Sequence, residues 1–108
     1  MIAQTPAPPY YAVIFTNVLS EPSKAYQEMA KLMENLVKDQ DGYLGHESAR
    51  DGLGITVSYW RDVEAINQWK HQSEHLLAQK LGREQWYQSF KTRICRVERE
   101  YGFGSENT

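Results

Sequence analysis

The chain has 108 residues, of which 41% are hydrophobic and 24% charged, the composition of an ordinary globular domain with one core. Its net charge of -2 offers no basic surface for a nucleic acid, and no apolar run approaches the roughly 20 residues that a membrane span needs. The amino-terminal segment lacks the basic and apolar regions of a secretory signal, and the single cysteine, Cys95, fits a reducing compartment, so we expect a cytoplasmic protein.

Both ends of the chain differ in composition from its centre. Residues 1–9 are rich in proline and alanine and predict a flexible or extended leader, and residues 104–108 predict a loose tail. We therefore expect one domain over residues 10–103.

The first half of this domain predicts a strand, a helix and a hairpin. Apolar residues occupy both faces of a strand over residues 11–19, so we expect that strand to be covered on both sides. Helical spacing of apolar residues predicts a helix over residues 24–38. Strands over residues 43–50 and 53–61 flank Asp51-Gly52, a strong hairpin signal.

The second half predicts another helix and a last strand. Asp62 is a good N-cap for a helix that begins after it. Ser73, followed by Glu74, resembles a fresh N-cap, so we expect this helix to break there and to restart through Leu81. A run over residues 90–103 alternates apolar and charged residues, as in a half-exposed strand. The element order is β-α-β-β-α-β, the ferredoxin-like arrangement of the α+β class, with an antiparallel sheet.

Two helices on one face of such a sheet leave its other face open. Ile14 and Val18 are predicted to lie on the open face, with Trp60 or its neighbours. Because an apolar sheet face needs a partner, we expect a homodimer in which the two sheets pack on each other.

Two tryptophans close together in the sequence suggest a binding pocket. Trp60 ends a predicted strand, and Trp69 lies two and a half turns into the following helix. Their indoles could line one cleft, with N–H donors aimed inward, which suits a flat aromatic ligand. The alternative is that both side chains simply fill the core.

Asn17 and His75 are the polar candidates for this pocket. Asn17 shares a strand face with Phe15, so it could orient an oxygen of the ligand, or it could bond the following turn. His75 is expected to face the cleft near Trp69, where a neutral imidazole could accept a proton.

The segment His71–His75 reads H-x-x-E-H, a pattern that binds zinc on a continuous helix. We reject a metal site because Ser73 is expected to interrupt the helix and no third ligand follows. His71 is then a solvated surface residue. Cys95 has no histidine near it in the sequence, so we expect no nucleophilic role for it.

Several segments together resemble the antibiotic biosynthesis monooxygenase (ABM) domain family of the dimeric α+β barrel superfamily. They are Tyr11-Ala12-Val13-Ile14-Phe15, Ser58-Tyr59-Trp60 with Glu64-Ala65-Ile66 and Trp69-Lys70, Glu74-His75-Leu76-Leu77-Ala78-Gln79 with Gly82-Arg83, and the run from Arg93 to Gly102. The resemblance implies a homodimer that oxidises a small aromatic, quinol or polyketide-like substrate with dioxygen. It also implies that neither flavin nor metal is needed, because the deprotonated substrate supplies the electrons.

On this resemblance Asn17, Trp69 and His75 are the expected catalytic residues. The expected substrate-binding residues are Phe15, Tyr59, Trp60 and Gln79. No cofactor is expected. One branch of the superfamily degrades haem with a first-strand asparagine, a helix tryptophan and an axial histidine ten residues later. Asn17 and Trp69 match the first two, but Gln79 holds the histidine position and is a poor iron ligand, so haem is the weaker alternative. A third possibility is a non-catalytic dimer that only binds a small aromatic molecule.

Overall fold

The computed structural model describes residues 2–21, 23–79 and 86–104, without the side chains at positions 78 and 79. Its elements, in chain order, are β1 (Tyr10–Leu19), α1 (Lys24–Val37), β2 (Tyr43–Asp51), β3 (Leu53–Trp60), α2 (Val63–Gln79) and β4 (Tyr87–Val97). This is the β-α-β-β-α-β order predicted from the sequence.

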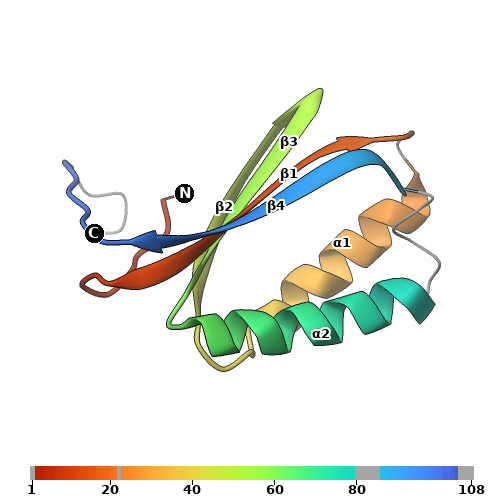
Figure 1. The fold of residues 1–108 in the computed structure, drawn as a ribbon. Coiled ribbons are helices and arrows are strands. Elements are labelled where there is room, and N and C mark those ends of the chain that lie inside the picture. Colours follow the sequence, from red (N-terminus) through yellow and green to blue (C-terminus); the bar gives the residue numbers. More distant parts are fainter. Residues whose placement is uncertain (1, 22, 80–85, 105–108) are drawn as a thin grey trace.

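The four strands form one antiparallel sheet in the order β2-β3-β1-β4. Both described helices lie on the same face of this sheet, and no helix of the described residues covers the opposite face (Figure 1). The α+β, ferredoxin-like fold expected from the sequence is confirmed. No helix in the described part of the chain is long and apolar enough to cross a membrane.

The β2–β3 hairpin sets the register of the sheet. Asp51 pairs with Leu53 around Gly52, whose φ of 76° lies in the region that favours glycine. The pairing places residues from all four strands side by side in rows on the helix-facing side. Three of these rows are His46–Ser58–Val13–Ile94, Ser48–Thr56–Phe15–Thr92 and Arg50–Gly54–Asn17–Phe90.

The core lies at one end of the sheet, between the strands and the helices. Trp60 is only 1% exposed and packs in one cluster with Val37, Ala65 and Ile66. Asp62 caps α2 as predicted, since its Oδ1 accepts a hydrogen bond of 2.8 Å from the backbone N–H of Ala65. Ala65 and Ile66 are the buried residues of α2 in the part with described side chains, so this helix is anchored mainly through its first turn.

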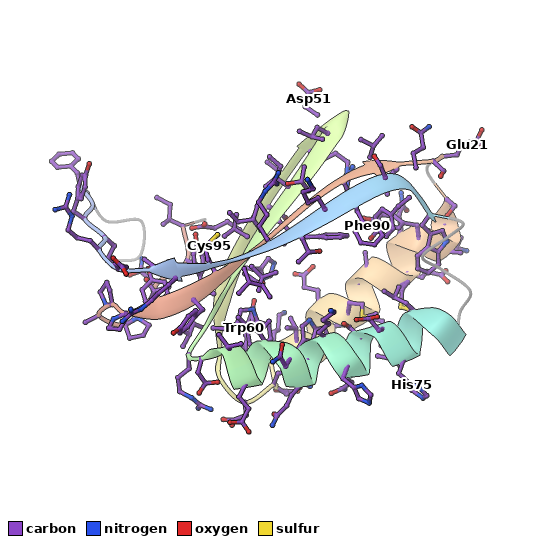
Figure 2. The ribbon with its side chains drawn as sticks, in the orientation of Figure 1. Glu21, Asp51, Trp60, His75, Phe90 and Cys95 are labelled. Atoms are coloured by element: carbon purple, nitrogen blue, oxygen red, sulfur yellow. The ribbon has the colours of Figure 1, made fainter. Side chains whose placement is uncertain are left out.

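Two details of the sequence-based prediction were wrong. Helix α2 does not break at Ser73, because the Ser73 hydroxyl donates to the backbone oxygen of Lys70 at 3.1 Å inside the helix instead of capping a new one. The predicted restart through Leu81 lies outside the described residues. The last strand covers Tyr87–Val97 instead of residues 90–103. Of Trp60 and its neighbours, Tyr59 lies on the open face as expected, whereas Trp60 lies on the helix-covered face with the core (Figure 2).

The amino-terminal segment lies against the open face of the sheet. The backbone N–H of Ala3 donates to Glu47 Oε2 at 2.9 Å, and the phenol of Tyr59 donates to Glu47 Oε1 at 2.6 Å. At the other side of this face, the phenol of Tyr10 and the hydroxyl of Thr5 both bond to the carboxylate of Glu100. The segment predicted as a flexible leader therefore makes specific contacts with the strands in the structure.

Candidate functional site

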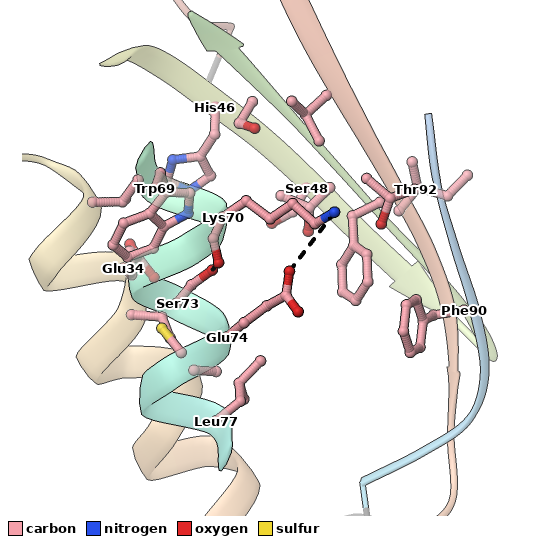
Figure 3. Close-up of a pocket in the computed structure, with 18 of the residues that line it drawn as sticks. Glu34, His46, Ser48, Trp69, Lys70, Ser73, Glu74, Leu77, Phe90 and Thr92 are labelled. Atoms are coloured by element: carbon pink, nitrogen blue, oxygen red, sulfur yellow. Dashed lines mark hydrogen bonds and ion pairs between the residues drawn. The ribbon is translucent and has the colours of Figure 1, made fainter. Parts of the chain in front are cut away.

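A cavity of about 890 Å³ lies between the sheet and the two helices. At its Trp60 end the cavity is bounded by the core cluster, to which α1 contributes Val37 and α2 contributes Ala65 and Ile66. Residues of every strand and both helices line it (Figure 3). Its volume falls in the range of cavities that enclose a small organic molecule.

Apolar and aromatic side chains form most of the cavity wall. Trp60 closes the core end, and its indole N–H donates to Ser58 Oγ at 2.9 Å. This N–H, which was expected to be aimed into the cleft, donates to a hydroxyl that itself lines the cavity. Trp69 of α2 is half-buried and lines the cavity together with Phe15 of β1. The structure thus brings Phe15, Trp60 and Trp69 into one cavity, as the sequence suggested.

A cluster of five aromatic rings forms the end of the cavity farthest from Trp60. Its members are Phe15, Tyr26, Trp86, Tyr87 and Phe90, with neighbouring ring centroids 5.5 to 5.9 Å apart. Most of these pairs meet edge to face, which is the favourable geometry for aromatic side chains. Sequence reasoning missed Trp86 and Tyr87, although two adjacent aromatic residues just before the last strand were a visible signal.

His46 is the imidazole that the cavity contains. It lies on β2, lines the cavity near Trp69, and shares a hydrogen bond through Nδ1 with the phenol oxygen of Tyr43 (Figure 3). Burial and the negative charge of Glu34 raise the pKa of Tyr43, so this phenol stays neutral near pH 7. Sequence reasoning missed His46, yet the hairpin register pairs it with Ser58, two residues before Trp60, and so predicts the same face.

One ion pair lies across the cavity from His46. Lys70 Nζ and Glu74 Oε1 are 3.8 Å apart, one turn apart on α2, and the side chain of Lys70 extends toward the strands near Ser48 and Thr92 (Figure 3). Both side chains are substantially exposed, so the pair is worth little to stability. It nevertheless puts charged groups beside an apolar wall.

Asn17 lies under the side chain of Arg50 instead of facing the cavity directly. Its side chain is 3% exposed, and its Oδ1 accepts a hydrogen bond of 2.5 Å from Arg50 Nη2. Arg50 lines the cavity, whereas Asn17 is not among the lining residues. The predicted role of Asn17 as a direct polar anchor is therefore wrong in its geometry, because the amide oxygen is already occupied by Arg50.

His75 and Tyr59 lie outside the cavity, contrary to expectation. His75 is exposed and points away from the sheet (Figure 2). It follows Trp69 by six residues, and at about 100° per residue an unbroken helix carries it about 240° around the axis. Tyr59 lies on the open face, because neighbouring residues of a strand point to opposite sides and Trp60 faces the helices. The side chain of Gln79 lies outside the described residues.

The described residues contain no cluster of side chains that could bind a metal ion. Among residues 2–21, 23–79 and 86–104 there is no group of three or more His, Cys, Asp or Glu side chains placed to hold a metal ion. Cys95 lies on β4 opposite Ala12, on the open face.

Comparison with known proteins assigns the family. The model of the "Monooxygenase af470-like" family matches residues 14–95, and the chain belongs to this family, which lies within the ABM monooxygenases. The uncharacterized protein YqjZ of Bacillus subtilis is 50% identical over 109 residues, which cover 99% of this chain and 95% of that protein. Jasmonate monooxygenase ABM of Pyricularia oryzae is 27% identical over 93 residues, covering 81% of this chain and 43% of that protein.

Solved structures support the same fold. SnoaB of Streptomyces nogalater, a cofactor-independent oxygenase, superposes with a TM-score of 0.70 at 10% identity, covering 86% of this chain and 97% of that chain. PA3566 of Pseudomonas aeruginosa superposes with a TM-score of 0.64 at 21% identity, covering 88% and 98%. At these identities the likeness establishes the architecture and not the chemistry.

Proposed function

We propose that the protein is a cofactor-independent monooxygenase that oxidises a small aromatic or polyketide-like substrate with dioxygen. The observation that carries this proposal is a cavity with aromatic walls that contains one imidazole, His46, held by the neutral phenol of Tyr43. Membership of a monooxygenase family supports it.

His46 replaces His75 as the proton acceptor in this proposal. A hydroxyl can accept as well as donate, so the oxygen of Tyr43 can accept the Nδ1 proton of His46. That tautomer leaves Nε2 as the ring's acceptor, and the same hydrogen bond stabilises the imidazolium once Nε2 has taken a proton. Histidine is the side chain that acts most often as a general base in enzymes.

The proposed reaction balances without an external reductant. His46 removes a proton from an activated CH₂ group that is flanked by aromatic rings, and the carbanion transfers one electron to dioxygen. The radical pair combines to a peroxide anion, which takes the proton back from the imidazolium of His46 and becomes a hydroperoxide. Loss of the second C–H proton and cleavage of the O–O bond then release water and leave a carbonyl. One oxygen atom enters the product, the other becomes water, and all four electrons come from the substrate. The walls formed by Trp69 and Phe15 hold the flat substrate and keep bulk water from the carbanion.

Oxygen uptake tests the proposal with His46→Gln against His71→Gln. The substrate is 1,8-dihydroxyanthrone, and rates are corrected for its uncatalysed oxidation. Loss of a general base costs about 10²- to 10⁴-fold, so His46→Gln should lower the initial rate at least a hundredfold. His71, exposed on α2 and not part of the cavity wall, should be replaceable without effect.

Two results would contradict this proposal. Equal rates for the two variants would remove His46 from the reaction. Saturable quenching of tryptophan fluorescence by the anthrone, without oxygen uptake in the wild type, would favour a binding protein. A hemin titration belongs to the same set, and a Soret shift that is lost in Trp69→Ala would favour the haem alternative, although His75 points away from the cavity.

We also propose that the open face of the sheet forms a homodimer with a second copy of the chain. Leu53 and Ile55 are 49% and 40% exposed there, and Leu53 pairs with Val18 of β1. Apolar residues in contact across neighbouring strands favour association over solvation. Light scattering at micromolar concentration should give twice the chain mass, and Leu53→Glu combined with Ile55→Glu should give the mass of one chain. A wild-type monomer would contradict the proposal.

A further inference from the structure

The charges that line the cavity differ in how they are neutralised. Lys70 has the carboxylate of Glu74 at 3.8 Å. Arg50, in contrast, has a neutral partner, the amide oxygen of Asn17, and no ion pair is found for it within the described part of the chain. Because an amide removes no charge, the guanidinium keeps its full positive charge at the rim of a largely apolar cavity.

The position of Arg50 depends on a glycine. Arg50 on β2 pairs with Gly54 on β3, and Gly54 pairs with Asn17 on β1, so the Arg50 side chain crosses Gly54 to reach Asn17. A Cβ at position 54 would lie 2.2 Å from Arg50 Nη2, which leaves no room for any other residue without moving the guanidinium. Asn17 is 3% exposed, so the acceptor that fixes Arg50 is itself fixed in the sheet.

This arrangement suits an anionic group of a ligand. A guanidinium has five N–H donors, and the bond to Asn17 uses one of them. Its planar fork matches the two oxygens of a carboxylate, and charge-assisted hydrogen bonds of this kind are about twice as strong as neutral ones. We propose that Arg50 binds the carboxylate of an elongated apolar acid whose body occupies the cavity, and that Asn17 and Gly54 are positioning residues for it.

The sheet also sets the length of such a ligand. His46 and Arg50 are four residues apart on β2, which corresponds to roughly 13 Å along a strand at about 3.3 Å per residue. If the proposed function holds, the carboxylate and the reacting carbon are separated by about this length. The inference therefore rests on the proposed function for the reaction, but not for the binding of the acid.

Binding of two matched probes tests the proposal without any turnover. The probes are 1-pyrenebutanoate and 1-pyrenebutanamide, which share the same flat body and differ in the charge of the head group. Dissociation constants are measured by quenching of tryptophan fluorescence, since Trp60, Trp69 and Trp86 all line the cavity. We expect the wild type to bind the acid about tenfold more tightly than the amide, and the preference to shrink at high salt.

Three variants should abolish this preference while the amide binds as before. Arg50→Gln removes the charge. Asn17→Asp keeps the shape and the hydrogen bond but neutralises the guanidinium with a carboxylate. Gly54→Ala displaces the guanidinium. Arg99→Gln, which removes an arginine that is exposed and does not line the cavity, should retain the full preference.

Two outcomes would overturn the proposal. Equal binding of acid and amide by the wild type would remove the anion site. A preference that survives Arg50→Gln and disappears in Lys70→Gln would assign the site to Lys70. If Asn17→Asp or Gly54→Ala melts at a much lower temperature than the wild type, Arg50→Gln decides alone, since Arg50 is exposed. Failure of oxygen uptake, with the acid preference intact, would overturn only the proposed reaction.

Discussion

The two faces of the sheet are built from the same strands but handle their polar groups in different ways. On the open face, the carboxylate of Glu47 accepts hydrogen bonds from Tyr59 and from the backbone of Ala3, and Glu100 is bonded by Tyr10 and Thr5. On the helix-covered face, His46 and Arg50 each have a neutral partner that holds the side chain but leaves its chemistry in place.

This difference distinguishes polar groups that stabilise the fold from polar groups that suit a ligand. A carboxylate with several donors has its hydrogen-bonding capacity used within the protein, and removing one partner costs stability. A side chain held through one atom by a neutral group is oriented, yet it can still bind or exchange a proton with something else. In this molecule, a charged or basic side chain that is held by a neutral partner is therefore a better indicator of a ligand site than a carboxylate bonded by several donors.

The largest effect that we expect from this comparison is on stability, at the core end of the cavity. Trp60→Ala should lower the free energy of unfolding by about 3–5 kcal/mol, because truncation of a buried aromatic leaves a cavity in the core. Trp60 is 1% exposed and packs against Val37, Ala65 and Ile66. Urea unfolding at a fixed protein concentration, followed by circular dichroism, measures the change.

Trp69→Ala is the matched control, since Trp69 is half-buried and lines the same cavity from α2. Its loss should cost clearly less stability than the loss of Trp60. Equal losses in the free energy of unfolding would mean that both indoles belong to the core and that Trp69 is not mainly a wall of the cavity.

A smaller effect is expected on the open face. Tyr59→Phe removes the hydrogen bond to Glu47 and should cost about 1 kcal/mol at neutral pH. Oxygen uptake and probe binding should stay as in the wild type, because Tyr59 does not line the cavity. A marked change in either would mean that the two faces are coupled.

The same residue predicts a pH dependence of stability. Burial, followed by the hydrogen bond to Glu47 and its negative charge, raises the pKa of Tyr59 from 10.0 to about 12. The folded state therefore retains this proton when the unfolded state has lost it, so the stabilisation is complete below pH 10 and is lost as the pH rises toward 12. Unfolding curves between pH 9 and 12 should show a steeper loss for the wild type than for Tyr59→Phe, and parallel curves would contradict the assignment.

Much of the fold was predictable because it depends on local patterns. Residues close together in the sequence determine the alternation of the strands, the helical spacing of apolar residues, the Asp51-Gly52 hairpin and the Asp62 cap. Each of these features is confirmed. The break expected at Ser73 failed because a serine inside a helix can satisfy its hydroxyl on the preceding turn without ending the helix.

The candidate site was less predictable because it depends on pairing between strands. Phe15, Trp60 and Trp69, which the sequence analysis named for the pocket, all line the cavity. The β2–β3 register places His46 and Arg50 on the cavity side of the sheet. Their position therefore follows from the sequence only after the two strands have been aligned. His75 was expected to face the cleft near Trp69, but on the unbroken helix α2 it points away from the sheet.

Because of the hairpin register, the turn at Gly52 also determines which face of the sheet the cavity residues of β2 occupy. His46 and Arg50 are both on β2, and Ser58 and Gly54 face them on β3. Because side chains alternate along a strand, a slip of one residue between these strands would turn β2 around and move the imidazole and the guanidinium to the opposite face together. A single-residue insertion beside Gly52 would therefore switch off proton transfer and acid recognition in one step, although it alters no residue of the cavity.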